Sequence, residues 1–168
     1  MGVELGAGAT NAPRVLREIE GDFQAEVQVV GSVPILRPNL VGKYPWYGAG
    51  FLVWQDDNNY VRFERARIIF GDDGPVYANW ELRQHGKFVR KGANEEGRLD
   101  EAQDAHLKLT RKGNTFAAAY SRDGKDWKEL PPITAELAKT LKVGVIATQN
   151  TPLGYEAAFE KLKITVAN

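Results

Sequence analysis

The stretch "GAGFLVWQDDNNYVRFERAR", from Gly48 to Arg67, contains the pattern that decides the fold. Its second half alternates apolar and polar side chains, so that Val61 and Phe63 fall on one face of a β-strand. The other face of that strand carries Tyr60, Arg62 and Glu64. The preceding "QDDNN" consists of residues that form turns by bonding to their own backbone. The stretch therefore predicts a hairpin with one apolar and one polar face.

The same period-2 alternation recurs along the chain, with turn residues about every ten positions, which is typical of an all-β sandwich or barrel. The 168 residues suffice for one such domain. The predicted strands are Phe23–Val30, Gly50–Gln55, Tyr60–Ile69, Val76–Gln84, Lys87–Arg90, Ala105–Arg111, Thr115–Ser121, Val143–Thr148 and Ala157–Val166.

Two connecting segments depart from this alternation. "TAELAKTLK", Thr134 to Lys142, predicts one short connecting helix, because Thr134 can cap it and Pro131-Pro132 block its upstream extension. Gly31 to Gly50 contains three prolines and four glycines, so it is predicted to be a loop. Its aromatic residues, Tyr44, Trp46 and Tyr47, are then either exposed binding anchors or a plug at the end of the sandwich.

The strand "YANWELR" brings a second set of polar residues to the predicted sheet. If it pairs with the strand that begins at Tyr60, one polar surface forms from Tyr60, Arg62, Glu64, Asn79, Glu81 and Arg83. One interpretation is a set of exposed ion pairs worth a few tenths of a kcal/mol each. The other is a sugar-binding face, on which charged and amide groups bond to hydroxyls and aromatic rings stack on pyranoses.

Glu64 and Glu81 are also the candidates for the acid and nucleophile of a glycosidase, which need carboxyl groups about 5 to 9 Å apart across a cleft. The neighbouring arginines Arg62, Arg65, Arg67 and Arg83 should hold these carboxylates ionised, which favours salt bridges over a proton-donating acid. The acidic strand signatures of laminarinase-like sandwich hydrolases, E-x-D-x-E and E-x-D-x-x-E, are absent from the sequence.

The remaining motifs exclude most cofactor chemistry. "QDDNN" supplies oxygen ligands that calcium could use, but it lacks the calcium-loop pattern, so a turn is the preferred interpretation. His85 and His106 are too far apart for a local metal motif, and the chain has no cysteine. Serine-nucleophile, phosphate-loop and dinucleotide motifs are missing. We expect no cofactor, with calcium left open.

Charge and hydropathy limit the partners. Basic and acidic residues number 22 each, which gives no general attraction to nucleic acid. "RQHGKFVRKG", Arg83 to Gly92, is basic but is predicted to be a hairpin tip. No apolar run approaches the roughly 18 residues of a spanning helix, so we expect a soluble chain without membrane insertion. We interpret residues 1–10 as a linker or expression remnant and residues 11–168 as one domain.

The stretches "GAGFLVWQDDNNYVRFERA", "YANWELR", "LKLTRKGNTFAAAYSRDGKDWKEL" and "LKVGVIATQNTP" resemble the DUF1349 family in content and order. That family comprises bacterial and fungal concanavalin A-like jelly rolls and is related in fold to the C-terminal accessory domain of β-xylosidases. The resemblance covers roughly Asn11 to Val166. It implies a two-sheet antiparallel sandwich whose concave face often binds glycans, in an extracellular or periplasmic setting. In "SRDGKDW", Asp123 and Gly124 are expected to form a turn under Trp127.

These observations predict an all-β, two-sheet antiparallel jelly-roll sandwich that serves as a noncatalytic carbohydrate-binding or surface-interaction module for a poly- or oligosaccharide. One alternative is a structural or protein-docking domain beside neighbouring domains of a longer protein, without sugar binding. The other is a glycoside hydrolase that uses Glu64 and Glu81. Trp54 is either a contact or part of the core. The expected ligand-binding residues are Trp46, Tyr47, Trp54, Arg62, Glu64, Asn79 and Glu81.

Overall fold

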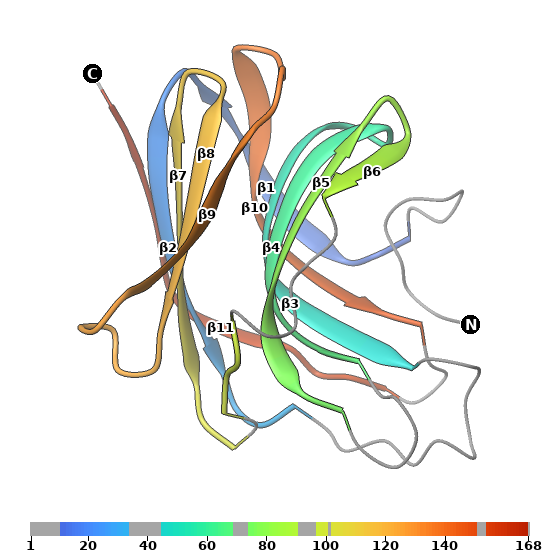
Figure 1. Ribbon diagram of the computed structural model, residues 1–168, viewed down its shortest axis with the longest axis vertical. Helices are drawn as coiled ribbons and strands as arrows, with labels where there is room; N and C mark the ends of the chain where they lie inside the picture. The colour runs from blue at the N-terminus through green and yellow to red at the C-terminus, as the bar shows by residue number, and fades with distance from the viewer. Residues whose placement is uncertain are drawn as a thin grey trace.

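The computed structural model describes residues 11–33, 45–68, 74–90, 97–100, 102–150 and 154–167. These residues form eleven β-strands and no helix (Figure 1). The strands are Arg14–Glu20 (β1), Phe23–Val30 (β2), Trp46–Asp56 (β3), Asn59–Ile68 (β4), Val76–Gln84 (β5), Lys87–Arg90 (β6), Ala105–Lys112 (β7), Thr115–Ser121 (β8), Lys128–Thr134 (β9), Thr140–Gln149 (β10) and Ala158–Val166 (β11).

The strands build two antiparallel sheets that face each other. The six-stranded sheet has the order β1-β10-β3-β4-β5-β6, and the five-stranded sheet has the order β11-β2-β7-β8-β9. In Figure 1 the strands β3, β4 and β5 bend away from the five-stranded sheet, so that the outer face of the six-stranded sheet is concave. The predicted jelly-roll sandwich is confirmed.

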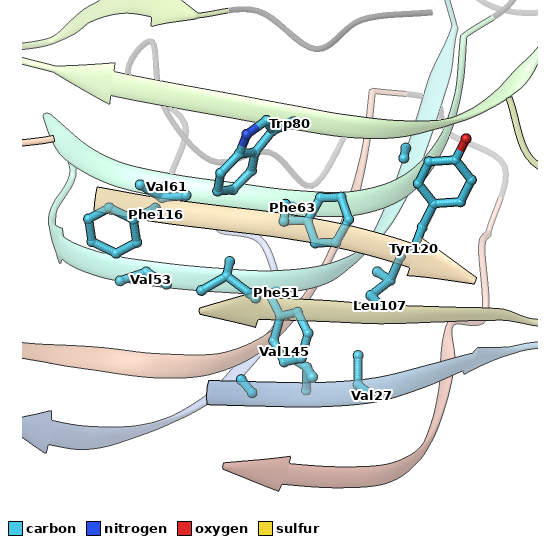
Figure 2. Packing of buried hydrophobic residues seen from close by; sticks show 14 of the residues in the cluster. Val27, Phe51, Val53, Val61, Phe63, Trp80, Leu107, Phe116, Tyr120 and Val145 are labelled. Carbon is cyan, nitrogen blue, oxygen red and sulfur yellow. The ribbon is translucent and has the colours of Figure 1, made fainter. Parts of the chain in front are cut away.

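The core fills the space between the two sheets, and it follows the predicted alternation (Figure 2). Val61 and Phe63 of β4 point inward and are fully buried. The Phe63 ring meets the Trp80 ring edge to face at 5.5 Å, and the Trp80 indole Nε1–H donates to the carbonyl oxygen of Pro131 at 3.0 Å. Because this indole is both packed and hydrogen-bonded, it links β5 of one sheet to the edge strand β9 of the other.

The predicted helix at Thr134–Lys142 is wrong. β9 ends at Thr134 and β10 begins at Thr140, and the residues between them form no helix or strand. Ala135 and Leu137 are buried while their neighbours are exposed, which is the period of a strand-like segment. The Ala135 N–H donates to the carbonyl oxygen of Asn114 instead of to a helical partner.

The loop predicted from Gly31 to Gly50 is also wrong at its C-terminal end, because β3 begins at Trp46. Trp46 and Tyr47 are therefore strand residues, whereas Tyr44 and most of the segment lie outside the described residues. The sequence missed β1 and β9 altogether. β9 contains Pro131 and Pro132 and lies at the edge of its sheet, where missing backbone donors are tolerated.

The remaining predicted strands are observed within a few residues of their expected bounds, apart from Ile69, which lies outside the described residues. The predicted hairpin tip after Arg83 is a turn at His85 and Gly86, both with positive φ, between β5 and β6. Among the described residues, no helix is long and apolar enough to cross a membrane.

Candidate functional site

The six polar residues predicted to share a face do share one, on the outer side of the six-stranded sheet. The register of β4 and β5 places them directly opposite one another in three pairs: Tyr60 with Arg83, Arg62 with Glu81, and Glu64 with Asn79. We call this surface the β4–β5 polar face. The alternation of the two strands therefore predicted its members correctly.

The β4–β5 polar face is not a set of exposed ion pairs. The exposed fraction is 0% for Glu64 and 6% for Arg62, Asn79, Glu81 and Arg83. Charged groups with so little contact to water are costly unless each one is paired and hydrogen-bonded. The expectation of weak surface pairs is therefore wrong for this face.

Arg62 holds two carboxylates at once. Its Nε lies 3.0 Å from Oε2 of Glu64, and its Nη2 donates to Oε2 of Glu81 at 2.8 Å. Glu64 also accepts hydrogen bonds from Thr148 Oγ1 at 2.8 Å and from Asn79 Nδ2 at 3.1 Å. These donors satisfy both oxygens of Glu64 and fix the geometry of the triad of Arg62, Glu64 and Glu81.

Gly48 of β3 makes room for the Glu64 carboxylate. A Cβ atom at this position would lie 2.8 Å from the Glu64 side chain and 2.8 Å from Thr148 Oγ1. Real Cβ atoms essentially never approach this closely, so any larger residue would displace the carboxylate or the hydroxyl. Sequence reasoning missed both Gly48 and Thr148, because only the neighbouring strands bring them to Glu64.

Three buried atoms of the triad have no hydrogen bond within the described part of the chain, and one of them, Nε of Arg62, is held only by its ion pair with Glu64. Nη1 of Arg62 and Oε1 of Glu81 are buried and lack a partner among the residues that the structure describes. One is a charged donor and the other a charged acceptor, so the pair can take one acceptor and one donor from another molecule. Unsatisfied buried charges of this kind are uncommon and call for an explanation in terms of water, a ligand or function.

The electrostatics of the face follow from burial. Burial raises the pKa of Glu64, although Arg62 and the Thr148 and Asn79 hydrogen bonds oppose the shift. The expected downward shift by the arginines is therefore wrong for this residue, and Arg65 and Arg67 lie on the opposite face of β4. Burial lowers the pKa of Arg62, but attraction to Glu64 and Glu81 outweighs this effect and raises it. Burial raises the pKa of Tyr77 to about 12, and Glu64 adds to that shift.

Two half-buried indoles border the triad along β3. The Arg62 guanidinium lies 5.3 Å from the centre of the Trp46 ring. Trp54 packs beside Leu52 and Tyr60 on the outer face, with the Arg14 guanidinium at 5.4 Å and the Lys142 ammonium at 5.1 Å from its ring. Trp54 is thus outside the core between the sheets.

Tyr47 is the one expected contact residue that the structure separates from the others. It lies on the inner face of β3, is 1% exposed and packs on Tyr155 at 5.0 Å between ring centres. Of the expected set, the structure brings together Trp46, Arg62, Glu64, Asn79 and Glu81, with Trp54 farther along the same face.

Both turns singled out in the sequence are built by their own side chains. Asp56 Oδ1 accepts from the Asn58 N–H at 2.8 Å and from Asn59 Nδ2 at 2.9 Å. Asp123 Oδ1 accepts from the Lys125 and Asp126 N–H groups at 2.8 and 2.9 Å, and Gly124 has a φ of +75°. Among the described residues, no group of three or more metal-ligating side chains is placed to hold an ion.

Comparison with solved structures identifies the fold class. The chain is similar to a functionally unknown protein from Saccharomyces cerevisiae, with 20% identity, a TM-score of 0.73, and coverage of 95% of this chain and 77% of that one. It is similar to the xylan β-1,4-xylosidase of Bacillus halodurans, with 13% identity, a TM-score of 0.69, and coverage of 91% of this chain. The chain spans only 29% of that xylosidase.

Galectin-Ib of Xenopus laevis matches with 6% identity and a TM-score of 0.56, over 91% of this chain and 100% of that one. At these identities the likeness shows the fold alone, a jelly-roll sandwich of the kind found in galectins and in part of the xylosidase. No family model and no curated protein sequence matches the chain, so the resemblance to the DUF1349 family stays a prediction.

Proposed function

We propose that this domain is a noncatalytic glycan-binding module and that a neutral oligosaccharide binds along the β4–β5 polar face. The observation that carries the proposal is the incomplete hydrogen bonding of the triad, at Nη1 of Arg62 and Oε1 of Glu81. Sugar hydroxyls act as donors and acceptors at once, so a single diol can satisfy both atoms. The jelly-roll fold, which galectins share, supports the same reading.

The indoles supply the stacking that a sugar site needs. Trp46 and Trp54 lie eight residues apart on one face of β3, which corresponds to roughly 26 Å of strand at about 3.3 Å per residue. The triad lies between them, so the face suits several sugar units. Both unpartnered atoms are buried, and the ring that lies over the guanidinium is Trp46. In our proposal this indole turns from the guanidinium onto the sugar as the ligand enters.

The same geometry argues against hydrolysis by Glu64 and Glu81. A glycosidase needs its two carboxyl groups on either side of the scissile bond, with space for the sugar between them. Here both carboxylates contact one guanidinium, so Arg62 occupies the space between them. Glu64 is fully buried, accepts hydrogen bonds from Thr148 and Asn79 and pairs with Arg62, so both of its oxygens already have partners within the protein.

The alternative of a docking domain is supported by the length comparison and by one exposed edge. The chain matches 29% of the xylosidase chain, which is the size of one domain within a longer protein. The side chains of Phe88 and Val89 on the edge strand β6 are 44% and 61% exposed. A docking domain would leave sugar without effect, so the same experiment separates the two functions.

The experiment is a titration with neutral xylo-, cello- and galacto-oligosaccharides of increasing length, followed by tryptophan fluorescence and calorimetry. We expect saturable binding with Kd between micromolar and millimolar and with affinity that rises with chain length. Trp46→Ala should weaken binding about three- to tenfold through lost stacking, without unfolding the domain. Trp127→Phe, on the five-stranded sheet side, is the matched control and should bind normally.

Three outcomes would contradict the proposal. The first is a folded protein that gives no response to any oligosaccharide, which would favour the docking domain. The second is a Trp46→Ala variant that loses stability and binding in equal measure, which would make Trp46 a structural residue. Release of reducing sugar that disappears in Glu64→Gln would favour the hydrolase.

A further inference from the structure

The outer face of the five-stranded sheet carries a pocket that is separate from the β4–β5 polar face. It has a volume of about 310 Å³, and its lining includes Trp127, Lys125, Lys161, His106 and Gln28. This volume is at the lower end of the range for small-molecule sites. The residues come from β2, β7, β11 and the turn after β8, so the pocket depends on the folded sheet rather than on one loop.

The Trp127 indole gives the pocket an aromatic wall. The Lys108 ammonium lies 3.9 Å from the centre of this ring and pairs with Glu26 Oε1 at 3.3 Å. Trp127 lines the pocket, whereas Lys108 does not. On another wall the Gly124 backbone packs so closely on His106 that a Cβ atom would lie 3.2 Å from the imidazole.

Lys161 is held at the pocket by an unusual backbone conformation. It has a φ of +55° and lies at the register shift between Glu160 and Lys163, where β11 bulges against β2. Left-handed backbone is unfavourable for a lysine, and bulges commonly redirect a side chain. Here the Lys161 Nζ donates to Gln28 Oε1 at 2.9 Å, and two of its three N–H groups remain for another acceptor.

The charges around the pocket leave cations without a counter-ion. Glu26 pairs with Lys108. Asp123 accepts hydrogen bonds from Ser121 Oγ and two backbone N–H groups, which lower its pKa to about 2, so it keeps its negative charge in the pocket lining. Lys125 and Lys161 together outweigh this single carboxylate. Lys125 and Lys161 form no ion pair with any residue that the structure describes. We propose that this pocket binds an anionic sugar, a hexuronate being the simplest, with its ring on Trp127 and its carboxylate between Lys125 and Lys161.

The test uses the four indole N–H signals of the ¹⁵N-labelled domain, with the Trp127 signal assigned from Trp127→Phe. The titrants are D-glucuronate, D-glucose and acetate at equal concentration and ionic strength. Glucuronate and glucose differ in whether a carboxylate is present, and acetate carries the carboxylate without the ring. We expect glucuronate to shift the Trp127 signal saturably and the other two to shift it much less.

Lys161→Gly separates binding from folding, because glycine adopts positive φ without strain and the variant should be at least as stable as the native protein. We expect it to weaken glucuronate binding about three- to tenfold. Lys112→Ala removes the same charge from an exposed position of β7 outside the pocket and should bind glucuronate normally. Equal shifts with glucose or acetate, no shift at Trp127, a shift confined to another indole signal, or undiminished binding by Lys161→Gly would each overturn the proposal.

Discussion

Both sheets of the sandwich carry charged residues on their outer faces, but these residues are buried on one face and exposed to water on the other. On the β4–β5 polar face, Arg62 and Glu64 have side chains that are 8% and 0% exposed. On the five-stranded sheet, the Lys108–Glu26 pair spans 3.3 Å, and its side chains are 27% and 38% exposed. One face is thus a buried ionic network and the other a hydrated one.

The difference shows that alternating charges in a strand do not reveal whether the charges are solvated. What distinguishes the two faces is the set of neighbours. The buried network rests on Gly48, a hydroxyl from Thr148 and an indole from Trp46, all supplied by other strands. The hydrated face has lysines long enough to keep their ammonium groups in water.

The largest expected effect comes from removing the guanidinium of the buried network. Arg62→Met leaves Glu64 and Glu81 as uncompensated buried charges, so we expect the free energy of unfolding to fall by about 3 to 5 kcal/mol. Lys108→Met removes a cation of the hydrated face and should cost less than about 1 kcal/mol. Urea denaturation of the two variants measures both values. Similar losses of unfolding free energy in the two variants would show that the charges of the two faces contribute equally to stability, despite their different exposure.

The second prediction concerns Gly48 of β3, whose lack of a side chain leaves space for the Glu64 carboxylate. Gly48→Ala places a Cβ atom against the Glu64 carboxylate and Thr148 Oγ1, and we expect a loss of about 1 to 3 kcal/mol. The matched control is Gly154→Ala, because nothing lies within 4 Å of its Cβ position and its φ is not positive. A Gly48→Ala variant as stable as this control would mean that the carboxylate can move without penalty.

The sequence predicted most of the sandwich because strand alternation and turn residues act locally. It placed the polar partners of Arg62 and Glu64 on one face, and the register confirms the pairing. It also predicted the turns at His85-Gly86 and Asp123-Gly124, where aspartate and glycine chemistry decides the backbone. These features depend on residues close together in the chain.

The wrong predictions concern segments whose structure depends on strands that are distant in the sequence. The segment after Thr134 has helical composition, but it forms no helix, and Ala135 and Leu137 are buried in the core. Two prolines concealed β9, whose edge position tolerates them. Burial of Glu64 depends on Gly48, which lies in a neighbouring strand, so a single sequence offers no local signal for it.

The smallest effect is a difference in pH dependence between the two regions. Because burial raises the folded-state pKa of Glu64 above its ordinary 4.5, the native protein holds that proton more tightly than the unfolded chain. Its contribution to stability should therefore decline as pH rises from about 4.5 through the folded pKa, with a slope of at most about 1.4 kcal/mol per pH unit. Asp123 behaves oppositely: its pKa falls from 3.8 to about 2, so its contribution is present above 3.8 and is lost as pH falls toward 2.

Comparing the native protein with single variants separates these contributions from those of all other groups. As pH rises above about 4.5, the native protein should lose stability relative to Glu64→Gln, whose side chain does not titrate. Below about pH 4.5 the difference in unfolding free energy between the two proteins should stay constant. The difference for Asp123→Asn should change only below about 3.8, where protonation of the carboxyl removes the acceptor that closes the turn. If both differences changed in the same pH window, burial would not be what distinguishes the two carboxylates, and the contrast between a buried and a hydrated face would lose its electrostatic basis.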